Sequence, residues 1–197
     1  MRAPEEMQIQ TKPRLPLPTI DMIFIRPMQI EDLEAVQSID RLSFSMPWPA
    51  SAYKYELEEN PLSMLWVAED VPTKGETHIV GLIVVWFIVD EAHIATLAVH
   101  PDHRTKGIAK ALLATALRAS ITKGFIKATL EVRANNSVAQ GLYCHFGFEI
   151  VGQRPRYYRD NNEDAIIMTA ADLDSNYLDW LENESWSRSE KDPGRSH

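Results

Sequence analysis

The most informative stretch of this sequence is Leu97-Ala-Val-His-Pro-Asp-His-Arg-Thr-Lys-Gly-Ile-Ala109. Its apolar start predicts a strand that ends at Val99, and a helix is expected to begin near Lys106. Gly107 and the small Ala109 allow a ligand to approach the backbone closely. The free N–H groups of a first helical turn carry partial positive charge, which suits a phosphate group. The stretch therefore predicts a strand, a short loop and a helix that together bind a phosphate-bearing ligand.

Basic residues add charge to this loop, namely Arg104, Lys106 and Lys110. The loop lacks the glycine pair and the Lys-Ser/Thr of a Walker A sequence, and it lacks the Gly-x-Gly-x-x-Gly of a dinucleotide-binding turn. On spacing alone, a helix start with solvated basic residues explains the pattern equally well. The ligand prediction thus needs the context of the rest of the chain.

Strands and helices alternate on both sides of this stretch. Hydrophobic periodicity predicts strands over 22–26, 62–69, 78–89, 93–99, 127–133, 149–152 and 165–169. It predicts helices that begin near residue 31 and span about 51–59, 107–123 and 137–146, with a marginal helix over 172–184. Gly124 is expected at the C-cap of the third helix and Asn136 at the N-cap of the fourth. An α/β domain with helices on both faces of a sheet is the expected architecture.

Length and composition favour one domain with tails. The chain has 197 residues, of which 45% are hydrophobic and 24% are charged. We expect a proline-rich leader over 1–20, a domain over 21–172, and a marginal helix with a polar tail over 173–197. No signal peptide is recognised, and the longest apolar run, 79–89, is too short to span a bilayer. The expected location is the cytoplasm.

Charge and cysteine content narrow the classes of partner. A formal net charge of −8 argues against a nucleic-acid-binding protein and is compatible with a basic peptide, although solubility explains most of it. The single cysteine, Cys144, cannot form an internal disulfide and is read as a packing residue. His93, His100 and His103 lack the helical spacing of a zinc site, so no metal is expected.

The motif Arg104-x-x-Gly107-x-Ala109 resembles the pyrophosphate-binding motif R/Q-x-x-G-x-G/A of the GNAT superfamily. Residues 22–170 also resemble the bacterial ribosomal-protein-alanine N-acetyltransferase family, RimI. The segments that carry this second resemblance are Pro47-Trp48, Asp90-Glu91-Ala92, Leu97 to Pro101 with Gly107-Ile108-Ala109, Leu130 to Asn136 with Leu142-Tyr143 and Gly147-Phe148, and Arg156-Tyr157-Tyr158 with Glu163 to Met168.

The resemblance implies the GNAT fold, with a mixed central sheet, and acetyl-CoA as the acyl donor. It also implies which residues bind that donor. Leu97 and Val99 would contribute backbone groups where neighbouring strands splay, and one of these N–H groups could stabilise an oxyanion. The remaining donor-binding residues implied are Arg104, Thr105, Lys106, Gly107, Ile108, Ala109, Lys110 and Asn136.

Two residues are the candidates for acid–base chemistry. Glu131 alone would be read as a solvent-facing strand carboxylate, but the resemblance makes it the base that deprotonates the acceptor amine. Tyr143 alone would be read as a core aromatic residue, but the resemblance makes it the acid that protonates the leaving thiolate. A phenol with a pKa near 10 is close enough to a thiol near 8.5 for this transfer.

The aromatic residues Phe44, Trp48 and Tyr157 are candidates for the entrance through which the acceptor binds. An equal alternative is that they pack the first two helices and the closing hairpin, which is formed by the last two predicted strands. The resemblance implies acetyl transfer to the N-terminal α-amino group of a protein, with the N-terminal alanine of a small-subunit ribosomal protein as substrate. Two alternatives remain open, because a fold does not fix the acceptor. One is an acetyltransferase for lysine or a small amine, and the other is an acyl-CoA sensor without catalysis.

Overall fold

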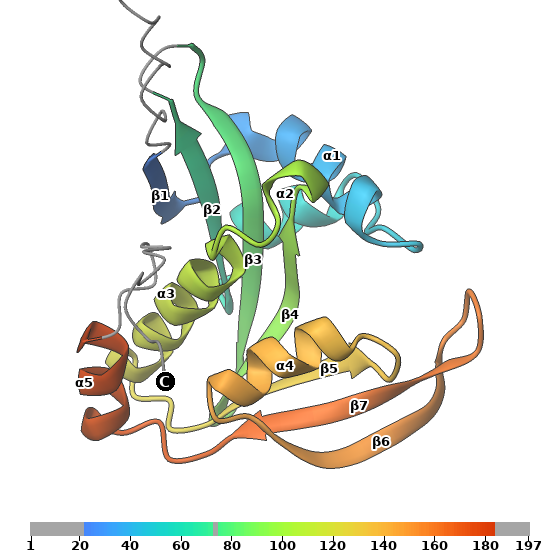
Figure 1. The fold of residues 1–197 in the computed structure, drawn as a ribbon, viewed down its shortest axis with the longest axis vertical. Helices are drawn as coiled ribbons and strands as arrows, with labels where there is room; N and C mark the ends of the chain where they lie inside the picture. Colours follow the sequence, from blue (N-terminus) through green and yellow to red (C-terminus); the bar gives the residue numbers. More distant parts are fainter. Residues whose placement is uncertain (1–21, 73–74, 184–197) are drawn as a thin grey trace, which may run out of the picture.

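The computed structural model of the protein describes residues 22–72 and 75–183, and in these residues seven strands form one mixed sheet. The strand order is β1-β2-β3-β4-β5-β7-β6 (Figure 1). The strands are β1 (Met22–Pro27), β2 (Ser63–Val71), β3 (His78–Ile88), β4 (Glu91–Val99), β5 (Ala128–Arg133), β6 (Glu149–Tyr158) and β7 (Glu163–Ala170). Strands β4 and β5 are parallel, and the other neighbours in this part of the chain are antiparallel. The expected mixed sheet is confirmed.

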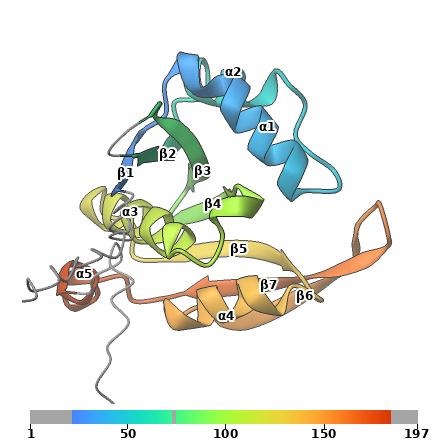
Figure 2. The same ribbon diagram turned by 45° about the horizontal axis from the view of Figure 1, so that its top comes forward.

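Helices cover both faces of the sheet, as expected (Figure 2). The first face carries α1 (Leu33–Ser43), which follows the short η1 (Ile30–Asp32), and α2 (Ala52–Glu58). The second face carries α3 (Ile108–Thr122), which follows η2 (Pro101–His103), then α4 (Ser137–His145) and α5 (Ser175–Asn183). We call them the α1/α2 face and the α3/α4 face. None of the helices described is long and apolar enough to cross a membrane.

The sequence of strand β3 explains why helices pack on both faces of the sheet. Its consecutive residues Leu82, Ile83, Val84 and Val85 are all fully buried. A strand can bury consecutive residues only when both faces of its sheet are packed, since alternate side chains point to opposite faces.

Strands β4 and β5 separate soon after they meet. Their pairing is limited to Ala92 with Ala128 and His93 with Thr129. Two residues after His93, Ala95 forms a bulge in β4, because Val85 pairs with Ile94 while Val84 pairs with Thr96. From the bulge to Val99, β4 remains paired with β3 and diverges from β5 (Figure 1). We call the space between the two strands the β4–β5 gap.

Gly81 on β3 lets α3 lie close to the sheet. A Cβ atom at this position would lie 3.1 Å from the side chains of Ile108 and Leu112 and 3.2 Å from the carbonyl oxygen of Ala98. Ile108 is the first residue of α3, so this contact also fixes where the helix begins relative to the end of β4.

The closing hairpin is longer than the sequence predicts. Strands were expected over 149–152 and 165–169, but β6 runs to Tyr158 and β7 begins at Glu163. The expected strand ends at Gly152, three residues before Pro155. Strand β6 lies at the edge of the sheet, where a proline interrupts no ladder on its outer side. Tyr157 is the second-to-last residue of β6, directly before the β6–β7 turn.

The C-terminal helix joins the core of the domain. Leu173 and Leu181 are 1% and 0% exposed, and α5 packs on α3. The expected domain boundary after residue 172 therefore falls inside this packing, and the described part of the expected tail belongs to the domain. The proposed leader over 1–20 and the tail from 184 onward lie outside the described residues.

We expect Gly81→Val to lower the free energy of unfolding by about 1–3 kcal/mol, because the added carbons overpack against α3. Chemical denaturation measures the change. Gly141→Ala is the matched control, since nothing lies within 4 Å of a Cβ atom there. Alanine inside helix α4 should stabilise the protein by about 0.5–1 kcal/mol. Wild-type stability of Gly81→Val would show that α3 does not need the close approach.

Candidate active site

The loop between β4 and α3 contains two residues with a left-handed backbone, Thr105 (φ 65°) and Gly107 (φ 81°). The carbonyl of Gly107 accepts the N–H of Ala111 at 3.1 Å. The N–H groups of residues 108–110 therefore precede the first intrahelical hydrogen bond and have no acceptor within the helix. They lie at the positive end of a helix of 15 residues, so the loop and the first turn can bind an anion through the backbone.

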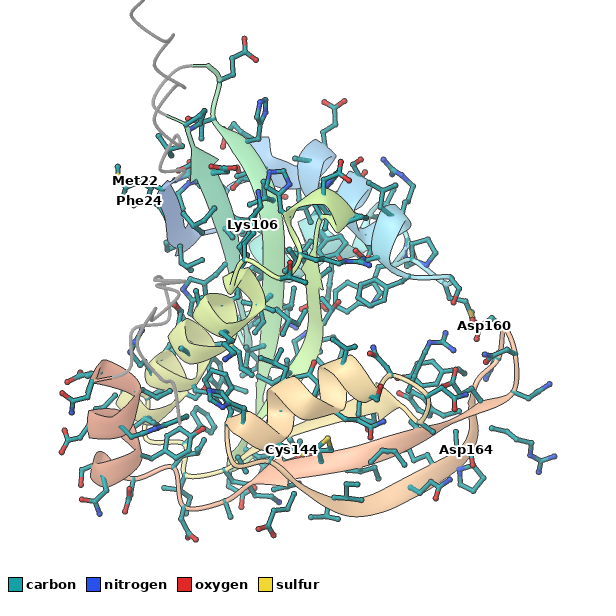
Figure 3. All side chains as sticks on the ribbon, in the orientation of Figure 1. Met22, Phe24, Lys106, Cys144, Asp160 and Asp164 are labelled. Atoms are coloured by element: carbon teal, nitrogen blue, oxygen red, sulfur yellow. The ribbon has the colours of Figure 1, made fainter. Side chains whose placement is uncertain are left out.

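The basic residues of the loop have different roles. Lys106 and Lys110 are exposed beside the start of α3, and Figure 3 labels Lys106. Arg104 donates from Nε to the carbonyl oxygen of Val99 at 3.1 Å and from Nη2 to Ser43 Oγ at 3.5 Å. Its guanidinium thus ties the loop to the end of β4 and to α1, and the two lysines supply the exposed positive charge.

Leu97 and Val99 direct their side chains into the core of the α3/α4 face. Their backbone groups border the β4–β5 gap, on the side where β4 has no neighbouring strand. Across the gap, Asn136 caps α4, and its side-chain oxygen accepts the N–H of Ala139 at 3.1 Å. The expected cap is confirmed, and a ligand contact of the exposed Asn136 side chain stays a prediction.

Glu131 lies in the middle of β5 between two basic side chains. Its Oε2 is 3.3 Å from Nε2 of His93 on β4, and its Oε1 is 3.0 Å from Nη2 of Arg154 on β6. The Glu131 side chain is 12% exposed, so the carboxylate is neither a free surface group nor a fully buried one. Each of its carboxylate oxygens contacts one basic side chain, and little of the carboxylate reaches solvent.

Tyr143 on α4 is 8% exposed and packs beside Phe148, with their ring centroids 5.8 Å apart. Burial, with a smaller contribution from Tyr158, raises the pKa of the Tyr143 phenol far above neutral pH. The hydroxyl therefore stays protonated at neutral pH and can donate a hydrogen bond. It makes no hydrogen bond to the residues that the structure describes, so its donor capacity is available to a ligand.

Glu131 and Tyr143 belong to opposite faces of the sheet. Leu130 and Val132 are buried with Tyr143 in the core of the α3/α4 face, so Glu131 between them points to the α1/α2 face. A carboxylate and a phenol on opposite faces can act on one small group only if that group lies in an opening of the sheet. The β4–β5 gap is such an opening.

The α1–α2 loop is fixed beside Glu131 by a buried carboxylate. Asp40, which is 1% exposed, accepts hydrogen bonds of 2.7 Å from the backbone N–H of Trp48 and from the hydroxyl of Tyr53. Burial raises the pKa of Asp40 despite these bonds. The ring of Trp48 stacks on Trp86 with a centroid distance of 5.9 Å, and Trp86 stacks on His93 at 5.7 Å.

A row of stacked rings thus leads from the loop to the His93–Glu131 pair. The predicted entrance residues Phe44 and Trp48 are half-buried in the core of the α1/α2 face. Packing and shaping of the acceptor side are both consistent with their positions.

The β6–β7 turn is linked to the same loop. Arg133 at the end of β5 contacts Asp160 at 2.8 Å and Glu163 at 3.0 Å, and its guanidinium lies 3.9 Å from the ring centroid of Tyr158. Arg133 also donates to Ser45 Oγ at 3.0 Å, and the Ser45 hydroxyl donates to Asp160. The Ser45 hydroxyl and the Arg133 guanidinium hold the pKa of Asp160 below its usual range. These contacts join the loop at Ser45 to the hairpin.

The sequence alone did not identify several of these residues as part of the site. His93 was considered only as a metal ligand, and Arg154 and Arg133 were not singled out. No group of three or more potential metal ligands occurs among the described residues. Strand alternation places His93 on the α1/α2 face, but its distance from Glu131 depends on the pairing of β4 with β5. Arg154 reaches Glu131 across β7, a contact that only the strand order reveals.

The chain resembles known proteins in sequence and in fold. Residues 33–148 match the Acetyltransferase (GNAT) family. The chain is 36% identical over 144 residues to a Bacillus subtilis protein provisionally assigned as a ribosomal protein bS18-alanine N-acetyltransferase, and the alignment covers 73% of this chain and 92% of that protein.

Two solved structures are similar. The ribosomal-protein-S18-alanine N-acetyltransferase from Escherichia coli has a TM-score of 0.67 and 28% identity, covering 76% of this chain and 94% of that chain. The NatC complex bound to Gag peptide and CoA contains a chain with a TM-score of 0.69 and 26% identity, covering 76% of this chain and 98% of that chain.

We expect Gly107→Glu to lower the affinity for CoA by about tenfold or more, because a side chain disfavours the left-handed backbone and a carboxylate repels phosphate. Isothermal titration calorimetry measures the affinity. Gly124→Glu is the matched control, since Gly124 also has a positive φ (88°) but lies beyond the other end of α3. Equal affinities of the folded variants would remove the Gly107 loop from the binding site.

Proposed function

The chain belongs to the acetyltransferase (GNAT) family, and from this premise we propose that it acetylates the N-terminal α-amino group of a protein, with the N-terminal alanine of a small-subunit ribosomal protein as its substrate. It is an N-acetyltransferase that uses acetyl-CoA as acyl donor. A ribosomal substrate would place the enzyme in the cytoplasm. The observation that carries the proposal is the Glu131 carboxylate, which faces the α1/α2 side at the β4–β5 gap while Tyr143 lies on the opposite face.

The residues present suit acetyl-CoA. The first turn of α3 offers backbone N–H groups to the pyrophosphate, and Lys106 and Lys110 add charge. The backbone of β4 beyond the bulge can bind the amide groups of the pantetheine arm, since it has no strand partner on the gap side. With these contacts in place, the thioester would lie in the gap.

Direct attack of the amine follows from this arrangement. Glu131 takes a proton from the acceptor ammonium, either directly or through one water molecule. The neutral amine nitrogen forms a bond to the thioester carbon, and a backbone N–H of β4 at Leu97 or Val99 stabilises the oxyanion. The carbon–sulfur bond then breaks, Tyr143 donates its proton to the thiolate of CoA, and the second proton that the nitrogen loses returns to the Tyr143 phenolate. The proton on Glu131 returns to solvent.

Contacts on the acceptor side support a chain end as the substrate. We call the α1/α2 face the acceptor side, because Glu131 points to it. On this side, the contacts of Ser45 and Arg133 with Asp160 join the α1–α2 loop to the β6–β7 turn. The row of aromatic rings at Trp48 and Trp86 lies beside Glu131 on the same face. An acceptor that reaches Glu131 between these contacts and the aromatic rings has to be narrow and extended, as the end of a peptide chain is. The relative at 36% identity, which is provisionally assigned as a ribosomal protein bS18-alanine N-acetyltransferase, supports the same assignment.

A peptide-library acetylation assay with mass-spectrometric localisation tests the acceptor. Alanine-initiated peptides that also contain lysine should gain one acetyl group, on the α-amine. The same peptides with a blocked N-terminus should remain unmodified, and spermidine should be a poor acceptor. Acetylation of lysine alone or of the polyamine alone would contradict the proposal, and CoA binding without any transfer would favour the sensor alternative.

We expect Glu131→Gln to retain the fold and to lose most activity at neutral pH, because general-base catalysis is typically worth about 10²–10⁴-fold. Activity should recover in part as the pH rises past roughly 8, where an α-amine becomes neutral without help. A pH–rate profile measures this, with circular dichroism as the control for folding. Glu149→Gln, an exposed change on β6, should follow the wild-type profile. Superimposable profiles of folded Glu131→Gln and wild type would remove Glu131 from the mechanism.

A further inference from the structure

A cation already lies where the acceptor ammonium has to bind. Arg154 Nη2 is 3.0 Å from Oε1 of Glu131. The Arg154 side chain is 54% exposed, whereas that of Glu131 is 12% exposed. The guanidinium therefore covers the carboxylate from the solvent side, which is the side open to an incoming amine.

The second basic partner of Glu131 is held much more firmly. The His93 side chain is 19% exposed, and its ring stacks on Trp86. Trp86 is in turn fixed by the Trp48 ring and by a 2.9 Å hydrogen bond from its Nε1 to Glu56. An ammonium that approaches Glu131 cannot displace such a packed ring easily. Of the two basic partners, Arg154 is the one that can leave.

The backbone of the hairpin aims Arg154 at Glu131. Arg154 pairs with Ala165 and Tyr158 pairs with Glu163, so β6 has two residues more than β7 between these pairs. Asp164, labelled in Figure 3, fixes this bulge by accepting the N–H of Arg156 at 2.7 Å and the amide of Gln153 at 2.6 Å. This bulge follows Arg154. The register of Arg154 itself is set by an earlier bulge at Val151, because Ile150 pairs with Met168 and Gly152 with Ile167, and bulges often re-aim side chains beside active sites.

We propose that Arg154 is a displaceable counterion of Glu131, which occupies the place of the acceptor ammonium and leaves when the acceptor binds. The proposal rests on the proposed function of Glu131 as the base. The guanidinium already lies 5.6 Å from the ring centroid of Tyr157, so this ring can hold it after it leaves the carboxylate. Arg154 is thus a gating residue that the acceptor has to outcompete, and a cationic acceptor does so better than a neutral one.

The direct test compares acceptor KM values at pH 7 for Arg154→Gln and Arg159→Gln. Both changes remove one positive charge from the hairpin, but exposed Arg159 contacts none of the described residues through an ion pair or hydrogen bond. We expect Arg154→Gln to lower KM about two- to five-fold without raising kcat, because a competing, partly exposed ion pair is lost. Arg159→Gln and Arg154→Lys should retain a KM close to that of wild type. A raised KM in Arg154→Gln would mean that Arg154 binds the acceptor, and an unchanged KM would mean that it does not compete; either result overturns the proposal.

A pH series separates competition from a structural effect. The titratable groups that face Glu131 are His93 from β4 and Arg154 and Tyr158 from β6. His93 and Tyr158 are common to wild type and variant, so the ratio of their KM values reports on Arg154. The ratio should approach one above about pH 8–9, where the acceptor amine is neutral. A ratio that is constant with pH would indicate a structural effect and would contradict competition.

The two proposals fail in different ways. A wild-type enzyme that acetylates no α-amine contradicts the proposed acceptor. The KM comparison is then made with the amine that it does acetylate, a lysine peptide or spermidine. A lower KM of Arg154→Gln for that amine still supports the counterion, and an unchanged or raised KM overturns it.

Discussion

Strands β4 and β5 pair at only two positions, and the bulge at Ala95 then turns β4 along β3 and away from β5. Backbone groups inside a protein that lack a ladder partner are costly unless another group binds them. Divergence of the strands therefore produces a row of backbone groups that a ligand with amide groups can satisfy. It also opens the sheet where Glu131 and Tyr143 approach it from opposite faces. In the proposed mechanism, each face then supplies one part of the chemistry.

The two faces differ in their electrostatics. The α3/α4 face offers helix N–H groups, exposed lysines and a buried phenol whose pKa is raised, all of which suit a phosphate-bearing thioester. The α1/α2 face carries carboxylates in contact with basic side chains, Glu131 with His93 and Arg154 and Asp160 with Arg133. The carboxylates on this face have cations as their partners, so under our proposal the binding of a cationic acceptor is an exchange of ion pairs.

Much of this architecture could be predicted from the sequence, because the signals are local. Periodicity identifies α3, the side chain of Asn136 identifies the start of α4, and the glycine in the loop identifies the start of α3. The roles assigned to Glu131 and Tyr143 came from the family motif. Their positions on opposite faces became clear only from the sheet.

The hairpin and the partners of Glu131 could not be predicted in the same way. Gly152 and Pro155 resemble strand breakers, and only the edge position of β6 explains why the strand continues. The contact of Arg154 with Glu131 depends on the order β5-β7-β6 and on a bulge, both of which are non-local. The burial of Leu181 depends likewise on α3, which is distant in sequence.

A crystal structure of the protein with a non-hydrolysable acetyl-CoA analogue tests the role of the gap most directly. The carbonyl that replaces the thioester should lie between β4 and β5, with its oxygen within hydrogen-bond distance of a backbone N–H of β4 at Leu97 or Val99. The Tyr143 hydroxyl should lie close to the position of the sulfur, and Glu131 should face the opposite side of the carbonyl. An acyl group bound outside the gap, or one with Glu131 and Tyr143 on the same side, would contradict the mechanism.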